Sequence, residues 1–136
     1  MAPVARGVLI DTSALVAHLR GRVALHRALA SSDPLYVSAI TVYELEYGAL
    51  RAGRAPDLAA LERLLALAVL PLGRREAEEA ARLNARLAAQ GRGIGPRDAL
   101  IAATALTRGL SVATLNVDEF ARVTGLELVE LTPPSG

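Results

Sequence analysis

Apolar and polar residues alternate along this chain in a repeated pattern that predicts β-strands followed by helices. The first short apolar block, 7–10, contains Val, Leu and Ile and ends at a cluster of helix-capping residues, which marks a strand-to-helix junction. The predicted strands cover 7–10, 35–38, 69–72, 110–115 and 127–131. The predicted helices cover 14–20, 57–68, 74–89, 96–108 and 118–123, and one more runs from a cap at Ser38 or Thr41 to about residue 52.

Strands that are spaced by helices predict an α/β fold, in which helices cover both faces of a parallel sheet. We therefore expect a three-layer α/β/α sandwich with a mainly parallel central sheet of about five strands, in a single domain over 1–136. Residues 1–5 and 132–136 contain Pro and small polar residues and are expected to be flexible. Ligands of such sheets bind outside the carboxyl ends of the strands, so residues near those ends are the first candidates for function.

Four polar positions lie at the edges of apolar stretches: Asp11, Glu44, Asp98 and Asn116, the last with Asp118 just beyond it. Asp11 and Asn116 follow predicted strands, whereas Glu44 and Asp98 fall in the first two turns of predicted helices. All four can therefore converge at one end of the sheet. Taken singly, Asp11 also suits a helix cap, and Asp98 suits the favourable dipole position at the beginning of a helix.

Glu44 is harder to explain as an ordinary surface charge. It stacks at helical spacing with Ile40 and Gly48, which points it towards the sheet, whereas Glu46 lies on another face and suits a solvated charge. A carboxylate on a partly buried face is costly unless it is paired or binds a metal. Three carboxylates within ~4 Å of one another repel by about 4 kcal/mol per pair at an effective dielectric of 20, so the cluster requires a cation. All-oxygen ligands suit Mg²⁺ or Mn²⁺, which indicates metal-assisted phosphodiester hydrolysis.

The composition mainly excludes certain types of site and certain classes of protein. The 136 residues include no cysteine, which removes disulfides, thiolate nucleophiles and Cys-rich zinc sites. All 15 basic residues are arginine, so the chain lacks the lysine of Walker P-loops, Schiff-base enzymes, haloacid dehalogenases and response regulators. The longest apolar stretches, such as 64–72, are shorter than the ~20 residues of a membrane span. No leader segment is recognisable, so we expect a cytoplasmic protein.

Other motifs point to function less strongly. The glycines at 91, 93 and 95 follow a predicted helix rather than a strand, which does not match a dinucleotide fingerprint. His18 and His26 lie eight positions apart, so packing or surface roles fit them better than a two-histidine metal motif. Arginine clusters suit either solvated faces or a phosphate path; they comprise Arg20, Arg22 and Arg27, Arg51 and Arg54, and Arg92 and Arg97.

Segments 8–14, 38–48, 96–103 and 113–120, the last followed by Gly125 and Leu126, together resemble the PIN-domain ribonucleases, specifically the VapC-like toxins of toxin–antitoxin pairs. Each segment alone is moderately specific, whereas all four in this order and spacing are strongly so. The resemblance implies a Mg²⁺- or Mn²⁺-dependent endoribonuclease that cuts RNA by direct water attack and leaves a 5′ phosphate and a 3′ hydroxyl. It also implies a homodimer whose activity is held off by a VapB-like antitoxin.

By the same resemblance, Asp11, Glu44 and Asp98 match the three family acids that hold the metal, with Asp11 and Asp98 as its foremost ligands. Thr12 or Ser13 is expected beside the metal, where either hydroxyl would hold a water molecule or a phosphate. Asp11, Glu44 and Asp98 form the core of the predicted site, and Thr12 and Ser13 support it.

The fourth family position departs from the usual pattern. It is commonly an aspartate, and Asn116 takes its place here, so Asp118 or Glu119 is expected to supply the missing charge. This departure leaves open whether one or two ions bind. Two alternatives also stay open: a PIN-like nuclease that acts in RNA processing or on DNA, and a catalytically inactive PIN-like binding module.

Overall fold

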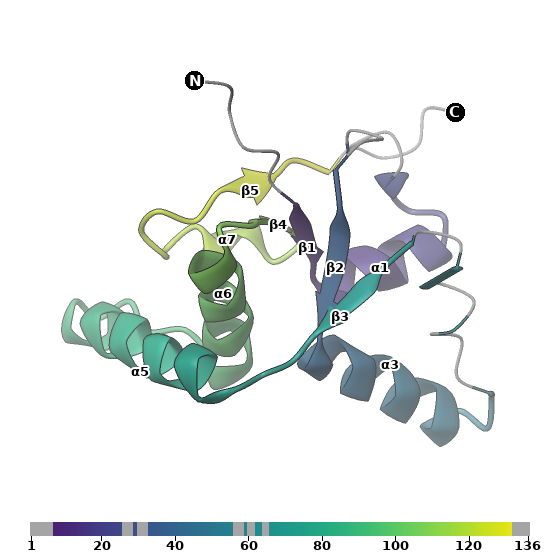
Figure 1. Ribbon diagram of the computed structural model, residues 1–136, viewed down its shortest axis with the longest axis horizontal. Coiled ribbons are helices and arrows are strands. Elements are labelled where there is room, and N and C mark those ends of the chain that lie inside the picture. Colours follow the sequence, from purple (N-terminus) through teal and green to yellow (C-terminus); the bar gives the residue numbers. More distant parts are fainter. Residues whose placement is uncertain are drawn as a thin grey trace.

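A computed structural model of the chain describes residues 7–25, 29, 33–55, 59, 62–63 and 66–131, which form a sheet with helices packed around it (Figure 1). The strands are β1 (Val8–Ile10), β2 (Leu35–Ser38), β3 (Ala68–Leu70), β4 (Ser111–Ala113) and β5 (Leu128–Val129). The labelled helices are α1 (Thr12–Leu19), α3 (Ala39–Arg51), α5 (Arg74–Ala89), α6 (Pro96–Arg108) and α7 (Val117–Phe120). The strand order is β3-β2-β1-β4-β5 and every pair is parallel, which confirms the predicted α/β class.

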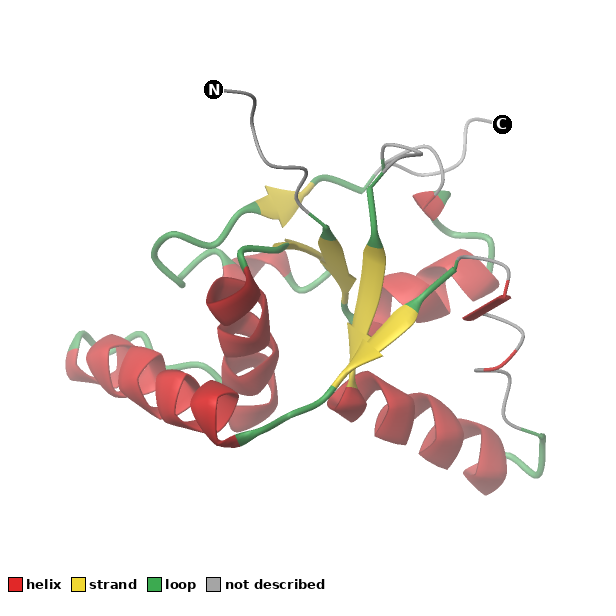
Figure 2. Ribbon diagram, in the orientation of Figure 1, coloured by secondary structure: helices red, strands yellow, loops and turns green. Residues whose placement is uncertain are grey.

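Two clusters of apolar side chains fill the two faces of the sheet. Successive residues of a strand point to opposite faces, so Leu9 packs with buried residues of α5 and α6. Val8 and Ile10 instead pack with Ala14 and Leu15 of α1 and with partly buried residues of α3. Figure 2 shows the resulting arrangement, with α5 and α6 on one side of the central strands and α1 and α3 on the other. The predicted three-layer sandwich is therefore confirmed.

The helices that follow β1 and β2 begin at the same end of the sheet. Only Asp11 separates β1 from α1, and α3 begins directly after Ser38, the last residue of β2. The Ser38 hydroxyl accepts a hydrogen bond from the Thr41 amide at 3.3 Å, so Ser38 is the cap of α3. Because β1 and β4 are in register, with Ile10 opposite Ala113, the segments that follow these two strands leave the sheet side by side.

Several predicted boundaries are wrong by a few residues. The helix predicted over 57–68 does not reach its expected end, because Ala66 has a left-handed backbone (φ 51°) and β3 begins at Ala68. That strand stops before Pro71, which has no amide hydrogen to continue the ladder. Strands β4 and β5 are shorter than predicted, and α1 and α7 begin one or two residues early. The predictions for residues 1–5, 132–136 and His26, and for most of 57–65, lie outside the described residues.

Helices α5 and α6 span the predicted ranges, and the loop between them is fixed by Asn84. Its side-chain amide donates to the Ile94 carbonyl at 2.8 Å, and its carbonyl oxygen accepts the Ile94 amide at 2.9 Å. Pro96 then occupies the first turn of α6, and Gly109 ends the helix in a left-handed conformation (φ 66°) that favours glycine. This loop and helix set the position of Asp98.

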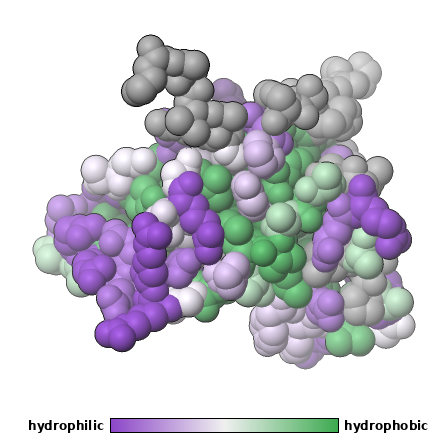
Figure 3. Space-filling model, viewed as in Figure 1, coloured by the Kyte–Doolittle hydropathy of each residue, from purple (hydrophilic) through white to green (hydrophobic). Residues whose placement is uncertain are grey.

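The outer face of α5 is strongly polar. Hydrophilic side chains gather over this helix in the space-filling view (Figure 3), and i,i+4 ion pairs join Glu78 to Arg74 and Arg82. Within the part of the chain that the structure describes, no helix has the length and apolar character needed to cross a bilayer.

Candidate active site

The structure brings Asp11, Glu44, Asp98 and Asn116 together at the carboxyl end of the sheet. Asp11 directly follows the central strand β1, and Glu44 lies in the second turn of α3. Asp98 lies in the first turn of α6, and Asn116 precedes α7. These residues come from four segments of the chain, and hydrogen bonds that run through the side chain of Arg97 join them into one continuous network.

A fifth residue, Arg97, joins the three carboxylates. Its Nη2 atom donates to Asp11 Oδ1 at 2.7 Å and to Glu44 Oε1 at 2.8 Å, and its Nε atom donates to Glu44 Oε2 at 2.7 Å. Its Nη1 atom donates to Asp98 Oδ1. The guanidinium therefore compensates the repulsion that three neighbouring carboxylates would otherwise produce. Burial lowers the pKa of Arg97, but its bonds to Glu44 and the charge of Asp11 outweigh this effect, and the pKa is raised overall.

Asp11 is the most deeply buried carboxylate of the network. Its Oδ1 atom accepts from the Thr12 amide at 2.8 Å as well as from Arg97, so it caps α1 and also belongs to the site. Its Oδ2 atom accepts from the hydroxyls of Ser13 at 3.0 Å and Thr114 at 2.8 Å. The structural explanation of Asp11 as a helix cap and its place in the acidic cluster are thus both correct. Four donors fix the orientation of its carboxylate.

Glu44 lies nearer to the surface than Asp11. The Thr12 hydroxyl donates to Glu44 Oε1 at 2.6 Å and lies 3.0 Å from the hydroxyl of Thr41. Burial raises the pKa of Glu44, but the hydrogen bonds from Arg97 and Thr12 outweigh it, so the pKa of this carboxyl lies below its ordinary value. Glu46 is two positions further along α3, about 200° round the helix axis, and so points away from this network.

Asp98, Asn116 and Glu119 form the far side of the site. The Asn116 side-chain amide donates to Asp98 Oδ2 at 2.7 Å and approaches Glu119 Oε2 at 3.4 Å. Burial and a hydrogen bond shared with Glu119 raise the pKa of Asp98 to about 6, and the same bond lowers the pKa of Glu119. Asp118 is exposed, and the hydrogen bonds described for Asp98 and Asn116 lead to Glu119 instead.

Carboxylate and amide oxygens are the ligands that Mg²⁺ and Mn²⁺ prefer, so the chemistry of these residues fits a hard divalent cation. The spacing of these residues, however, does not yet form a metal site. Within the described residues, no three acidic or histidine side chains stand close enough together to hold a metal ion as they are now placed. Arg97 lies between them. Its Nη1 atom contacts Asp98, its Nε atom contacts Glu44 and its Nη2 atom contacts both Asp11 and Glu44, so the three carboxylates line the edges of a planar guanidinium instead of facing one common point.

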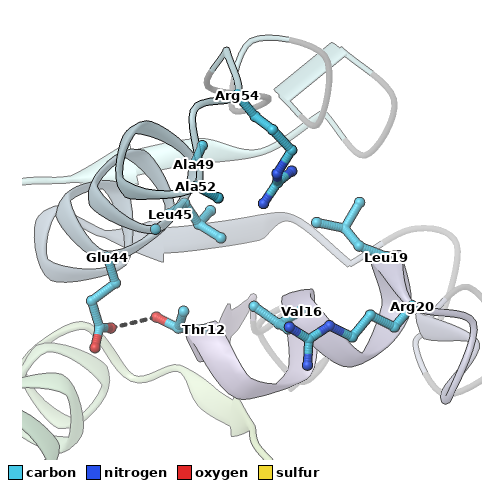
Figure 4. A pocket seen from close by; sticks show the side chains of 10 residues that line it. Thr12, Val16, Leu19, Arg20, Glu44, Leu45, Ala49, Ala52 and Arg54 are labelled. Carbon is cyan, nitrogen blue, oxygen red and sulfur yellow. Dashed lines mark hydrogen bonds between the residues drawn. The ribbon is translucent and has the colours of Figure 1, made fainter.

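A groove leads away from Glu44 between α1 and α3. It encloses about 630 Å³ and is lined by residues of both helices and of the turn after α3. Glu44 and Thr12 lie at one end, and Leu19 and Arg54 lie at the other (Figure 4). Arg20 also lines the groove, so two residues of the predicted arginine clusters share one channel with the acidic site.

Sequence reasoning missed three residues that shape the site. Arg97 was considered only as one arginine of a possible phosphate path, although its position next to Asp98 placed it within reach of the acids. Thr114 follows β4 just as Asp11 follows β1, but the strand predicted over 110–115 contains this position and so gave no signal of its role. The role of Thr41 depends on how α3 packs against α1, which no local pattern reveals.

Comparison with known proteins agrees with this fold. A family model of the PIN domain matches residues 8–126. Ribonuclease VapC1 of Rickettsia felis is 38% identical over 131 residues, which cover 93% of this chain and 97% of the relative. Ribonuclease VapC5 of Mycobacterium tuberculosis is 39% identical over 131 residues, covering 93% of this chain and 94% of the relative.

Solved structures give the same result. The VapBC complex of Salmonella typhimurium, crystallised with DNA, contains a chain that is 32% identical and has a TM-score of 0.71, covering 90% of this chain and 96% of that one. The VapBC-5 complex of Mycobacterium tuberculosis contains a chain that is 35% identical with a TM-score of 0.67, covering 93% and 96%. The predicted resemblance is thereby confirmed: this chain belongs to the PIN-domain family, and its relatives within that family are the VapC ribonucleases.

Proposed function

We propose that this protein is a Mg²⁺- or Mn²⁺-dependent endoribonuclease and the toxin of a toxin–antitoxin pair. One observation carries the proposal: three carboxylates from distant segments surround a single cationic group at the carboxyl end of a parallel sheet. Helix caps or surface charges would not need to converge in this way. The relatives named as ribonucleases support RNA as the substrate class, and cytoplasmic action follows from that substrate.

Asp11, Glu44 and Asp98 are the residues that would hold the cation. When bound there, a divalent cation supplies polarisation of the phosphoryl oxygen and lowers the pKa of a water molecule, which becomes the nucleophile. Asp11 keeps its orientation through four hydrogen-bond donors, so it provides a rigid anchor. Cleavage by direct water attack leaves a 5′ phosphate and a 3′ hydroxyl.

The two hydroxyl residues after Asp11 take different parts. The Ser13 hydroxyl makes its hydrogen bonds within the protein, because it donates to Asp11 and accepts the Leu115 amide at 3.0 Å. Thr12 lines the groove beside Glu44, so it is the one that faces an incoming phosphate or water. We therefore assign substrate positioning to Thr12 and support of the anchor to Ser13.

The fourth acid of the site is best supplied by Glu119. Asn116 links Asp98 to Glu119 through its side-chain amide, whereas Asp118 is exposed. Burial and a hydrogen bond with Glu119 raise the pKa of Asp98, and the same bond lowers the pKa of Glu119, so Glu119 lies directly beside one of the proposed cation ligands. Asn116 acts in this proposal by holding the two carboxyl groups in place.

The partner that we propose is a VapB-like antitoxin. The solved relatives are VapBC complexes, and one of them is described as a member of a family of toxin–antitoxin systems. Leu19, which lines the groove, and Tyr43, Tyr47 and Leu50 of α3 are large apolar residues that remain exposed, and they offer apolar surface for such a partner. A homodimer, which the family resemblance implies, stays a prediction.

Induced expression in a host that lacks the antitoxin tests the proposal. The wild-type protein should arrest growth, and Asp98→Asn should not, at equal levels of soluble protein. Purified wild-type protein should then be offered RNA and DNA side by side with Mn²⁺. Preferential cleavage of DNA would replace the proposal with a DNA nuclease, and growth without arrest and without cleavage of either would indicate an inactive binding module.

A further inference from the structure

Arg97 makes contacts that are unusual for a partly exposed arginine. One guanidinium contacts three carboxylates, through Nη2 to Asp11, through Nε and Nη2 to Glu44, and through Nη1 to Asp98. These are the same three acids to which we assign the divalent cation. The positive charge of the site thus already comes from the protein itself.

The guanidinium and a divalent cation cannot occupy these carboxylates at the same time. A magnesium ion draws its oxygen ligands to about 2.0–2.1 Å from one centre. The arginine instead spreads the same oxygens along the edges of a planar fork, at 2.7–2.8 Å from its nitrogens for Asp11 and Glu44. Closing the carboxylates onto one ion would push Asp11 and Glu44 into the space that the guanidinium fills, and it would place two cationic groups in contact.

The side chain of Arg97 is also placed so that it can leave the site. It lies in the first turn of α6, next to Asp98, and its side chain is 35% exposed, whereas those of Asp11 and Asp98 are 1% and 8% exposed. A long arginine side chain at the surface can therefore rotate away while the two buried carboxylates stay fixed by their other donors.

We infer that Arg97 is a built-in counter-cation that stabilises the metal-free site and must be displaced when a divalent cation binds. This inference rests on the proposed function, because it concerns the same three carboxylates. It makes the apparent metal affinity depend on the fraction of molecules in which Arg97 has left the site. If that fraction is about a tenth or less, removal of the arginine tightens metal binding by about tenfold or more.

Calorimetric titration with MnCl₂, without RNA, tests the inference on four purified proteins. Arg97→Gln should bind Mn²⁺ about tenfold or more tightly than wild type. Arg97→Lys keeps one positive charge but cannot bridge three carboxylates, so its Mn²⁺ affinity should fall between those of wild type and Arg97→Gln. Because it keeps this charge, Arg97→Lys still tests the inference if the neutral variant Arg97→Gln does not fold. Arg74→Gln removes an arginine that is ion-paired with Glu78 on the surface of α5, and its affinity should equal that of wild type.

Nuclear magnetic resonance adds a direct readout with diamagnetic Mg²⁺. The Arg97 Nε–H signal, identified by its absence in Arg97→Lys, should be slow to exchange with water in the metal-free protein and become fast on saturation with Mg²⁺. Equal Mn²⁺ affinity of wild type, Arg97→Lys and Arg97→Gln, with an unchanged Arg97 signal, would overturn the inference while leaving the metal site intact. No Mn²⁺ binding by any of the four proteins would overturn the proposed metal site itself.

Discussion

The hydroxyl of Thr114 provides a sensitive test of how Asp11 is held. Thr114 is buried, and its Oγ1 atom donates to Asp11 Oδ2 at 2.8 Å and accepts the Asn116 amide at 3.0 Å. Thr114→Val removes both bonds, and also the 3.2 Å contact of this hydroxyl with the Ser13 hydroxyl, while keeping the shape of the side chain. Thr104→Val is the matched control, because Thr104 is equally buried in α6 and its hydroxyl bonds only to the Leu100 carbonyl, which retains its own helical bond.

The size of the effect follows from the charge of the acceptor. A hydrogen bond to a charged group contributes ~1.5–3 kcal/mol, whereas a bond between neutral groups contributes ~0.5–1.5 kcal/mol. Both variants gain a similar apolar contact from the added methyl, so this gain cancels in the comparison. We expect Thr114→Val to be less stable than Thr104→Val by about 2 kcal/mol, which corresponds to roughly 8 °C in Tm for a chain of this size.

Thermal unfolding and RNA cleavage measure the two consequences separately. The loss of a supporting bond to a metal ligand typically costs ~10–100-fold in metal affinity or activity, so Thr114→Val should cleave RNA at least about tenfold more slowly with Mn²⁺. Thr104→Val should stay within about twofold of wild type. Equal losses of Tm in the two variants, or wild-type cleavage by Thr114→Val, would show that Asp11 does not depend on this hydroxyl.

The other predictions concern the acids and the amide directly. In metal-free buffer the folded protein keeps the Asp98 proton up to about pH 6, whereas the unfolded chain releases it near the ordinary pKa of aspartate, so the stability that this group contributes is lost as pH rises through 6. At pH 8 the Tm of Asp98→Asn should therefore be no lower than that of wild type. A Tm several degrees lower would contradict the argument that burial raises the pKa of Asp98. The same proton competes with the cation, so Mn²⁺ affinity measured by calorimetry should weaken from pH 7 to pH 5, and a flat profile would exclude Asp98 as a ligand. Glu44→Ala should lower cleavage at least tenfold while Glu46→Ala stays near wild type, and similar rates for both would mean that the wrong glutamate was chosen. Asn116→Ala should cost less than Glu44→Ala, because an amide that holds Asp98 and Glu119 in place adds no charge to cation binding; the reverse order of rates would refute this ranking.

Much of the fold is predictable from the sequence because local patterns dominate it. Helices α5 and α6 were predicted to the residue, since charged and apolar positions alternate with helical period in one and a Pro start with a Gly end bounds the other. The end of the 57–68 helix was not predictable in this way. Its leucines suit a helix and a strand equally, and the pairing of β3 with β2 decides the outcome.

The acidic residues of the site were predictable from the sequence, but the place of Arg97 among them was not. Asp11 and Glu44 were recognisable because strand ends and helical spacing place carboxylates at known positions relative to a sheet. The contacts of Arg97 link residues that are 53 and 86 positions apart, and its long side chain can point in several directions from the first turn of α6. Only the packed structure shows that it points into the acidic cluster. The assignment of Glu119 in place of Asp118 likewise depends on how α7 docks beside α6.

The most direct test of the central claim is cleavage of a mixed RNA substrate by the purified protein under three conditions. Wild-type protein should cut RNA with Mn²⁺ or Mg²⁺, lose this activity in EDTA and regain it when the divalent cation is restored. Asp98→Asn, folded and as stable as wild type at pH 8, should show no cleavage above background in any condition. Cleavage that persists in EDTA, or wild-type rates from Asp98→Asn, would contradict a metal-dependent nuclease built on Asp11, Glu44 and Asp98.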